Sequence, residues 1–555
     1  MDKGLILKYA LQNAIKFNGK ANQGAVIGKI LQESPDLKKD IKTLAKHVSE
    51  VIKDISKISV ADQKAELEKL APELLEEKKE AQKKELPELK NIKGKVIMRF
   101  EPSPSGPLHI GHAYVLSLNS EYCRKYKGEL ILRIGDTNPE NLYEPSYKLI
   151  EQDAKWVTKD NISKIILQSE RLEIYYRYME ELINIGKAYI CTCNPDEFKD
   201  MLINSIECPC RKLDAKETMK KWKKMFKEYK QGDAVARIKT NLNDKNPAMR
   251  DFPVFRINDS KHPKAGNKYR VWPLMNMAVA VDDIEMAITH VIRAKDHYDN
   301  ALRQKYIYGY LNKKFPEALF VGRINFEDMQ VSCSKTRPLI ENKTYSGWDD
   351  IRLPFLGALR RRGYQPEALI RYSLDVGVSL NDKKVSKKEF FKVINAFNKD
   401  TIDSKSDRYF FIWDPVEIKV EKAPKQSIEL DLHPEHKKGG RKLQANDEFY
   451  ITKGDFQALK ENNIYRLMDC LNFRKINGKF VFDSTEYEKY KKEGEKIIHW
   501  LPKTKLAEAE VLMPDNSELK GFIENNKLKL GDICQLERLG FARLDSKNRF
   551  WFTHN

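Results

Sequence analysis

The spacing of apolar residues predicts helices at the start of the chain. Leu5, Tyr9, Ala10, Ala14 and Ile15 recur at helical intervals. Residues 66–90 are rich in lysine and glutamate, contain no aromatic residue and are interrupted by Pro87. Such a run is typical of a solvated helix or a linker and carries no chemistry by itself. We therefore expect a polar helical extension at the N-terminus.

The pattern changes to alternating strands and helices near residue 95. A β-type run at 95–100, an apolar helix-like run at 113–124 and a second β-type run at 129–134 indicate a βα unit. After residue 408, short β-rich runs alternate with turns, at 416–420, 448–451, 478–482, 507–511 and 550–552. Strands at this spacing predict one or two β-barrels.

Length and charge narrow the class of protein. A chain of 555 residues, 41% of them apolar, is too long for one core and predicts about three to five domains. Its net charge of +19 favours a polyanion partner, nucleic acid before membrane, although a generally charged surface explains the excess equally well. No apolar run approaches the ~20 residues that span a bilayer, and no secretion signal is recognisable. We expect a soluble cytoplasmic protein with reduced cysteines.

The segment Arg99-Phe-Glu-Pro-Ser-Pro-Ser-Gly-Pro-Leu-His-Ile-Gly-His112 joins the first strand to the helix. A strand, a tight turn and a helix present backbone N–H groups to an anion at the helix start. The imidazoles of His109 and His112 can donate to phosphate oxygens, and Gly111 lets a flat purine approach the backbone. The Gly-Lys-Ser/Thr ending of a Walker loop is missing. The alternative is that the two histidines only cap the helix.

This segment resembles the HIGH motif of class I aminoacyl-tRNA synthetases, and more narrowly of their glutamyl/glutaminyl branch. The resemblance implies that His109 and His112 act on the phosphates of ATP and that Gly111 lies on the adenine side. The next strand end, residues 133–139, matches the family in several positions but has Gly135 where the family places a carboxylate. In the family, that carboxylate helps to hold the amino group of the substrate.

The resemblance also implies an amino-acid site made of Arg99, Ser103, Asp136 and Arg293. Arg293 stands in a segment similar to the family's Thr-His-x-x-Arg-x-x-Asp-His strand end, and the planar fork of a buried arginine suits a carboxylate. Two arginines fit an acidic amino acid, which carries two carboxylates. Met275 stands where the family often has a tyrosine, so the choice of glutamate over glutamine is less secure than the class.

A second motif, Asp328-Met-Gln-Val-Ser-Cys-Ser-Lys-Thr-Arg337, loosely resembles the Lys-Met-Ser-Lys-Ser loop of class I synthetases. The resemblance implies that Lys335 steadies the triphosphate from a mobile loop, with Ser332 and Ser334 as donors. The usual lysine of the family falls at Cys333. Without the first motif, this stretch would be interpreted as a polar surface turn.

Two Cys-x-Cys pairs, Cys191 with Cys193 and Cys208 with Cys210, are separated by fourteen residues. In a reducing compartment they suggest a tetrahedral Zn²⁺ site of four thiolates, structural because no position stays open; the alternative is two unligated thiol pairs. Residues 211–260 suit a strand-rich insertion with a basic face. There Arg237 is a candidate for a phosphate contact, and a solvated strand face is equally consistent with the pattern.

Two further segments resemble the RNA-binding parts of the branch. Arg360, Arg361 and Arg362 can neutralise phosphates on the inner side of a bent tRNA. The segment His433-Pro-Glu-His-Lys-Lys-Gly-Gly-Arg441 matches the barrel region of glutaminyl enzymes and of archaeal or eukaryotic glutamyl enzymes. The barrels would receive the anticodon, whose bases can stack on aromatic side chains.

The resemblance implies a multidomain α/β protein of the archaeal glutamyl type. The expected domains are an N-terminal helical extension (1–92), two halves of a Rossmann-like catalytic domain (93–188 and 284–344), a connective acceptor-binding insertion (189–283), a helical stem-contact domain (345–405) and a β-barrel anticodon-binding region (406–555). The implied reaction ligates L-glutamate to tRNA(Glu) with ATP and Mg²⁺, and a structural Zn²⁺ is expected.

The alternatives are a glutaminyl-tRNA synthetase and a non-catalytic tRNA-binding relative. The sequence leaves open whether tRNA(Gln) is also charged and does not give the oligomeric state, for which a monomer is the expectation.

Overall fold

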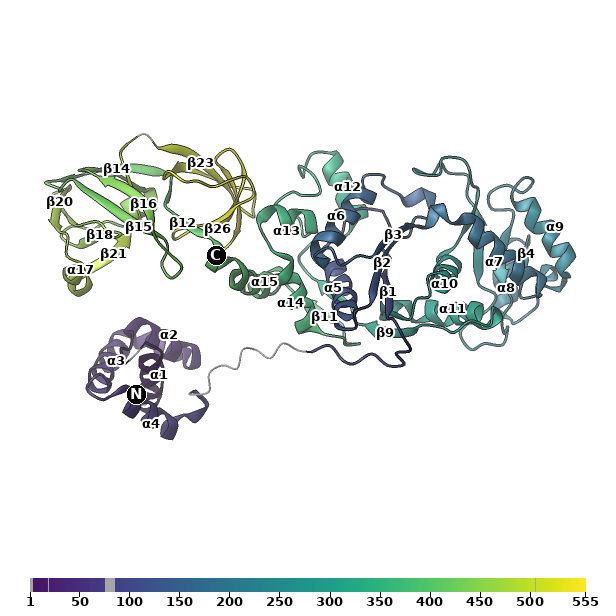
Figure 1. The fold of residues 1–555 in the computed structure, drawn as a ribbon, viewed down its shortest axis with the longest axis horizontal. Helices are drawn as coiled ribbons and strands as arrows, with labels where there is room; N and C mark the ends of the chain where they lie inside the picture. The colour runs from purple at the N-terminus through teal and green to yellow at the C-terminus, as the bar shows by residue number, and fades with distance from the viewer. Residues whose placement is uncertain (1–2, 18, 75–84, 505) are drawn as a thin grey trace. The chain divides into compact units, whose positions relative to one another are not determined.

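The computed structural model describes residues 3–17, 19–74, 85–504 and 506–555 (Figure 1). By its internal contacts the chain divides into two compact units, Met1–Lys84 and Glu85–Asn555. Within the described ranges, no helix is both long enough and apolar enough to cross a membrane.

The first unit is helical over its described residues, as the apolar spacing predicts. Its α-helices are α1 (Lys3–Lys16), α2 (Gln23–Glu33), α3 (Ile41–Ile55) and α4 (Val60–Leu70). Helix α3 shows the link between apolar spacing and burial most clearly. Leu44 and Val48 are four residues apart, so they lie on the same face of the helix, and both are fully buried. Of the lysine- and glutamate-rich run at 66–90, residues 75–84 lie outside the described residues.

The second unit begins with a parallel sheet. Strands β1 (Ile97–Phe100), β2 (Glu129–Ile134) and β3 (Lys164–Leu167) pair in that order, and helices α5 (Ile110–Lys125) and α6 (Ser146–Thr158) follow β1 and β2. A second parallel pair, β8 (His290–Ala294) and β9 (Glu317–Val321), lies beside β1, where the Thr289 N–H donates to the Ile97 carbonyl at 2.9 Å. The βα prediction is confirmed, with the helix starting three residues earlier than expected.

An antiparallel sheet lies between β3 and β8 in the sequence. It consists of β4 (Ala188–Cys191), β5 (Val235–Ile238), β6 (Pro253–Ile257) and β7 (Val271–Pro273) in that order. The neighbouring helices are α7 (Leu172–Asn184), α8 (Pro195–Ile203), α9 (Ala215–Met225), α10 (Met275–Glu285) and α11 (Tyr298–Tyr310). Trp222, Phe255 and Trp272 are fully buried and form the centre of its core.

Short helices connect this region to the C-terminal part. They are α12 (Cys333–Glu341), α13 (Leu356–Arg362), α14 (Pro366–Val376) and α15 (Lys387–Ile402), and a parallel strand pair, β10 (Ile324–Phe326) with β11 (Lys383–Val385), lies among them. Helix α14 packs on α5 and α15, and these helices share a hydrophobic core with the parallel sheet of β1, β2 and β3.

The C-terminal part is built from two seven-stranded sheets, which confirms the barrel prediction (Figure 1). The first contains, in order, β12 (Asp407–Tyr409), β25 (Ile533–Leu536), β26 (Gly540–Ser546), β27 (Arg549–His554), β23 (Ala507–Leu512), β24 (Glu518–Ile523) and β13 (Phe411–Trp413).

The second sheet contains, in order, β21 (Gly494–Ile498), β18 (Ile464–Leu467), β19 (Asn472–Ile476), β20 (Lys479–Ser484), β14 (Pro415–Glu421), β17 (Glu448–Thr452) and β22 (Leu501–Pro502). A hairpin of β15 (Gln426–His433) and β16 (Lys437–Ala445) carries Arg441, whose Nη2 lies 2.6 Å from Glu524 Oε1. Both side chains are buried, so this ion pair ties the hairpin to the end of β24.

Candidate active site

The two histidines of the first motif form the start of α5. The Nδ1 atom of His109 accepts from the Gly111 N–H at 3.0 Å, and the Nδ1 atom of His112 accepts from the His109 N–H at 3.3 Å. The predicted alternative, a helix cap, is therefore present in the structure. It leaves the donor role open, because a neutral ring that accepts at Nδ1 carries its proton on Nε2.

Both rings are neutral near pH 7. Burial lowers the pKa of His112 to about 4, and burial together with the neighbouring His112 holds the pKa of His109 well below its usual range. The two ring centroids are 3.8 Å apart. A pair of neutral imidazoles can stabilise anionic oxygens by donation without bringing a second proton equilibrium into the reaction.

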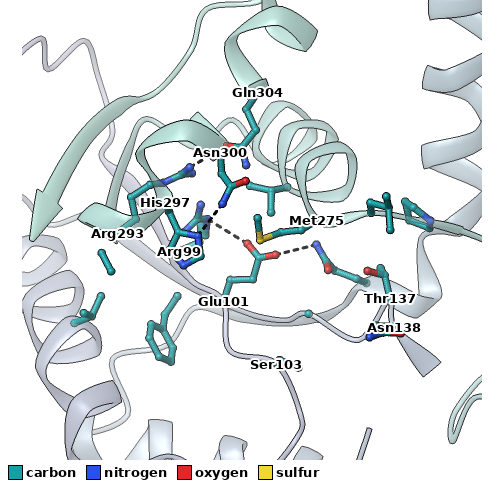
Figure 2. A pocket seen from close by; sticks show the side chains of 18 of the residues that line it. Arg99, Glu101, Ser103, Thr137, Asn138, Met275, Arg293, His297, Asn300 and Gln304 are labelled. Carbon is teal, nitrogen blue, oxygen red and sulfur yellow. Dashed lines mark hydrogen bonds and ion pairs between the residues drawn. The ribbon is translucent and has the colours of Figure 1, made fainter. Parts of the chain in front are cut away.

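A cavity of about 560 Å³ opens between the ends of the parallel strands β1, β2 and β8 (Figure 2). Phe100 at the end of β1, Gly135 after β2 and Ala294 at the end of β8 all line it. Carboxyl ends of parallel strands are the usual place for ligands in open α/β sheets. At the start of α5, Gly111 and His112 line the cavity, whereas His109 does not.

The predicted arginines meet at this cavity. Arg99 binds Asp283 with two nitrogens, Nε at 3.2 Å and Nη2 at 3.5 Å. Arg293 Nη1 donates to Gln304 at 3.0 Å, and its Nε and Nη2 are buried without a partner among the described residues. Burial, and then the neighbouring charge of Arg99, lower the pKa of Arg293 to about 10. A buried guanidinium with free donors next to another cation favours an anionic ligand.

Asp136, which is predicted to bind the amino acid, does not line the cavity. Its side chain is fully buried outside the cavity wall and accepts from the Ser169 N–H at 2.8 Å, the Ser169 hydroxyl at 2.7 Å and the Tyr147 hydroxyl at 2.9 Å. These bonds occupy the carboxylate and fix the turn after β2. Ser103, by contrast, lines the cavity.

The second motif lies against the first. The Cys333 thiol is 3.7 Å from the Pro107 carbonyl, and Arg337 donates to the carbonyl of Ser105. The two loops therefore meet, as the two-part site requires. Ser332 and Ser334 bond each other at 3.1 Å, while Lys335 is exposed; none of these three residues lines the cavity.

The four cysteines of the insertion form one cluster. Their Sγ atoms all lie within 4.8 Å of one another, with 3.7 Å between Cys191 and Cys208, 3.3 Å between Cys193 and Cys208, and 3.9 Å between Cys193 and Cys210. Four thiolates at ~2.3 Å from a tetrahedral zinc would be about 3.8 Å apart. The donor set and its spacing fit Zn²⁺.

The arginines predicted to contact tRNA differ in availability. Arg237 lies over the ring of Phe198 at 3.6 Å and donates to the Asp251 carbonyl at 3.2 Å. Arg361 forms ion pairs with Asp545 and Asp349. These contacts give both guanidinium groups structural partners.

Arg362, which is predicted to contact tRNA phosphates, is buried in the structure. Arg362 is 5% exposed and donates to the carbonyls of Phe552 and Thr553 at 3.2 and 2.8 Å. The Arg360 side chain is partly exposed and forms no hydrogen bond or ion pair with the described residues. Described contacts hold the guanidinium groups of Arg361 and Arg362 to other parts of the fold, whereas none holds that of Arg360.

Several residues of the site were missed by sequence reasoning. Glu101 lines the cavity, although it stands inside the quoted motif two residues after Arg99. Asn300 and Gln304 also line it, and their spacing of four on the helix after β8 is a signal that could have found them. Asp153 of α6 accepts from the Leu108 N–H at 3.2 Å, directly before the histidines, and burial raises the pKa of Asp153 to about 7 against the opposing charge of Arg360.

Comparison with known families places this geometry in a class. The catalytic-domain model of tRNA synthetases class I (E and Q) matches residues 95–404, and two anti-codon binding domain models of the same class match residues 406–489 and 497–545. The fold and the site are those of a class I tRNA synthetase for glutamate or glutamine.

Two curated relatives narrow the class. The chain is 41% identical to a glutamate–tRNA ligase of Methanothermobacter thermautotrophicus, over 99% of both chains, and 43% identical to one of Pyrococcus furiosus, over 98% of this chain and 97% of that one. The chain belongs to the archaeal glutamate–tRNA ligase family, as the motifs predict.

Proposed function

We propose that this protein is a glutamate–tRNA ligase. It activates L-glutamate with ATP to glutamyl-adenylate and transfers the glutamyl group to the 3′-terminal adenosine of tRNA(Glu). The observation that carries the proposal is a single cavity that joins the neutral donor His112 to the guanidinium of Arg293, whose Nε and Nη2 have no partner among the described residues. The first suits the phosphates of ATP and the second suits a carboxylate.

The charges of the cavity support glutamate over glutamine. Arg99, Arg256 and Arg293 line the wall together with one carboxylate, that of Glu101. A ligand with two carboxylates and one ammonium group balances this excess of positive charge better than an amide does.

The reaction needs no protein nucleophile. The substrate α-carboxylate attacks the α-phosphorus of ATP, pyrophosphate leaves, and a ribose hydroxyl of the tRNA then takes the acyl group from the adenylate. The protein contributes position and charge: His109 and His112 would donate from Nε2 to phosphate oxygens, and Lys335 would bring a cation from its exposed loop. Gly111 leaves room for the adenine side, Ser332 and Ser334 offer further donors, and Mg²⁺ accompanies ATP as the counter-ion of its phosphates.

We also propose a structural Zn²⁺ site and the parts of the protein that bind tRNA. Cys191, Cys193, Cys208 and Cys210 would hold a structural Zn²⁺, which would cross-link β4 to the segment before α9. On the tRNA side, Arg360 is the free cation of the arginine run, and the two C-terminal sheets would take the anticodon. tRNA(Gln) is a further candidate substrate, and a monomer is the proposed state.

Aminoacylation of purified tRNA tests this function. Charging of tRNA(Glu) and of tRNA(Gln) is measured with glutamate and with glutamine, and ATP–pyrophosphate exchange is measured with and without tRNA. We expect glutamate to be charged on tRNA(Glu), with exchange that depends on tRNA. Charging with glutamine alone would establish the glutaminyl alternative, and no exchange in the presence of cognate tRNA would establish a non-catalytic tRNA binder.

A further inference from the structure

Glu101 holds a particular position in the cavity. Among the described residues that line the wall, it is the only one with a carboxylate. Its side chain keeps 12% of its surface exposed, whereas the nearby carboxylates of Asp282 and Asp283 are 0% and 1% exposed. Glu101 is therefore the acidic group that a ligand in this cavity can reach.

The Glu101 carboxylate is fixed but not saturated. One oxygen accepts from Arg133 Nη2 at 2.6 Å, the other accepts from Gln168 Nε2 at 3.1 Å, and Arg99 Nε lies 3.6 Å away. A carboxylate offers about four lone-pair positions, so acceptor capacity remains. Figure 2 shows the carboxylate between Arg99 and Met275, on the side of the cavity.

Glu101 also fills the space above Gly135. A Cβ atom added to Gly135 would lie 3.7 Å from both Cγ and Oε1 of Glu101, and 3.5 Å from Gln168 Oε1. The two residues follow neighbouring strands, because Phe100 pairs with Leu132 in the β1–β2 register. A carboxylate is thus delivered from the end of β1 to a place beside the bare backbone at the end of β2.

We propose that Glu101 binds the α-ammonium group of the amino-acid substrate. This inference rests on the proposed function, because it assumes an amino acid in the cavity. The ammonium group needs an anionic acceptor, and the cations of the wall repel it. Glu101 meets that need and also fixes which end of glutamate faces the phosphates, so it acts as a specificity residue for α-amino acids over simple dicarboxylates.

The variant Glu101→Gln tests this role with two ligands. Glutamate and glutarate differ in the α-amino group, so the KM for glutamate and the competitive inhibition constant of glutarate are measured in the tRNA-dependent exchange assay. We expect the KM for glutamate to rise about 10- to 100-fold while the glutarate constant changes less than about threefold. An equal loss for both ligands, or no loss for glutamate, would overturn the proposal.

Moving the carboxylate provides a second, independent test. Glu101→Ala removes the group, and Glu101→Ala combined with Gly135→Glu returns it from the neighbouring strand into the vacated space, where a Cβ is accommodated without a contact closer than 3.5 Å. We expect the KM for glutamate of the double variant to be at least tenfold lower than that of Glu101→Ala. Gly135→Glu alone should be impaired, because its two neighbouring carboxylates repel each other.

The outcomes separate this inference from the proposed function. A wild-type protein that neither exchanges nor charges glutamate contradicts the function itself. A wild-type protein that charges glutamate, together with a double variant that recovers nothing and still melts at the wild-type temperature, contradicts only the role of Glu101.

Discussion

Gly106 and Cys333 are in direct contact, although one belongs to the first motif and the other to the second. A Cβ atom on Gly106 would lie 2.4 Å from Cys333 Sγ and 2.6 Å from Cys333 Cβ. Real Cβ atoms do not come so close to other heavy atoms, so the loops meet at this distance because position 106 has no side chain.

Gly106→Ala should therefore separate the two loops. We expect ATP–pyrophosphate exchange to slow about 10- to 100-fold, since a displacement of about 1 Å at a reacting site costs this much. The double variant Gly106→Ala with Cys333→Gly removes the clash and should recover most of the rate. Gly309→Ala is the matched control, because nothing lies within 4 Å of its added Cβ. Equal activity of Gly106→Ala and Gly309→Ala would contradict the contact.

Arg293 should contribute more to substrate binding than to folding. Its Nε and Nη2 atoms have no partner among the described residues, so Arg293→Lys removes the planar fork while it keeps a positive charge. We expect the KM for glutamate to rise about 10- to 100-fold, with little change in melting temperature, because two of the nitrogens removed bond no described residue and the lysine keeps the cation. A lower melting temperature with an unchanged KM would show a structural role.

Asp153 should make stability depend on pH. Its pKa is raised from the usual 3.8 to about 7 by burial, so the folded protein binds a proton that the unfolded chain releases. The stability contributed by this proton is complete below about pH 4 and is lost as the pH rises through 7. Asp153→Asn mimics the protonated form, and its amide oxygen can still accept from the Leu108 N–H.

The pH profile of melting temperature checks this expectation. The difference between Asp153→Asn and wild type should be small at pH 5 and should become positive by pH 8.5, where the wild type carries a buried charge. A difference that is constant with pH, or that shrinks as the pH rises, would contradict the raised pKa of Asp153.

The cysteine cluster should hold one zinc ion per chain. We expect metal analysis of the purified protein to give a ratio near one, and Cys210→Ser to lose the metal and lower the melting temperature, because a bound structural zinc stabilises the fold. Cys470→Ser, outside the cluster, is the control and should retain the metal. Wild-type protein with less than about 0.2 zinc per chain, and a melting temperature insensitive to a chelator, would favour two unligated thiol pairs.

Substitutions of Arg360 and Arg362 should have different effects, the first on tRNA binding and the second on stability. Arg360→Ala should weaken tRNA binding and reduce the slope of log affinity against log salt by about one, as expected for one lost phosphate contact. Arg362→Ala should instead lower the melting temperature, because it removes the two buried hydrogen bonds that Arg362 donates to the carbonyls of Phe552 and Thr553. A binding loss of equal size in both variants, with no change in melting, would contradict this division.

Much of the fold could be predicted because the relevant signals are local. The apolar run at 129–134 coincides with β2, and the five β-rich runs after residue 408 overlap β14, β17, β20, β23 and β27, with only residue 478 outside its strand. The histidine loop follows from a strand, a proline-rich turn and a helix in succession. Alternation and turn residues are properties of neighbouring positions, so they can be recognised in the sequence alone.

The details of the site depended on contacts between distant residues. Glu101 reaches Gly135 through the register of β1 on β2, and Asp136 turns away because Ser169 and Tyr147 bind it. Arg362 is buried because strand β27, almost two hundred residues later, packs against α13. Sequence spacing contains no information about such partners, so the burial of Asp136 and Arg362 could not be predicted from it.

The last strand of the chain has a consequence for how the protein can be handled. Strand β27 receives the guanidinium of Arg362, and beside it the His554 ring lies 3.0 Å from Asn398 Nδ2 of α15. Thr553 and His554 thus connect the sheet that contains β27 to helices α13 and α15. Deleting residues 553–555 would remove both contacts and should loosen the packing of this sheet against α13 and α15.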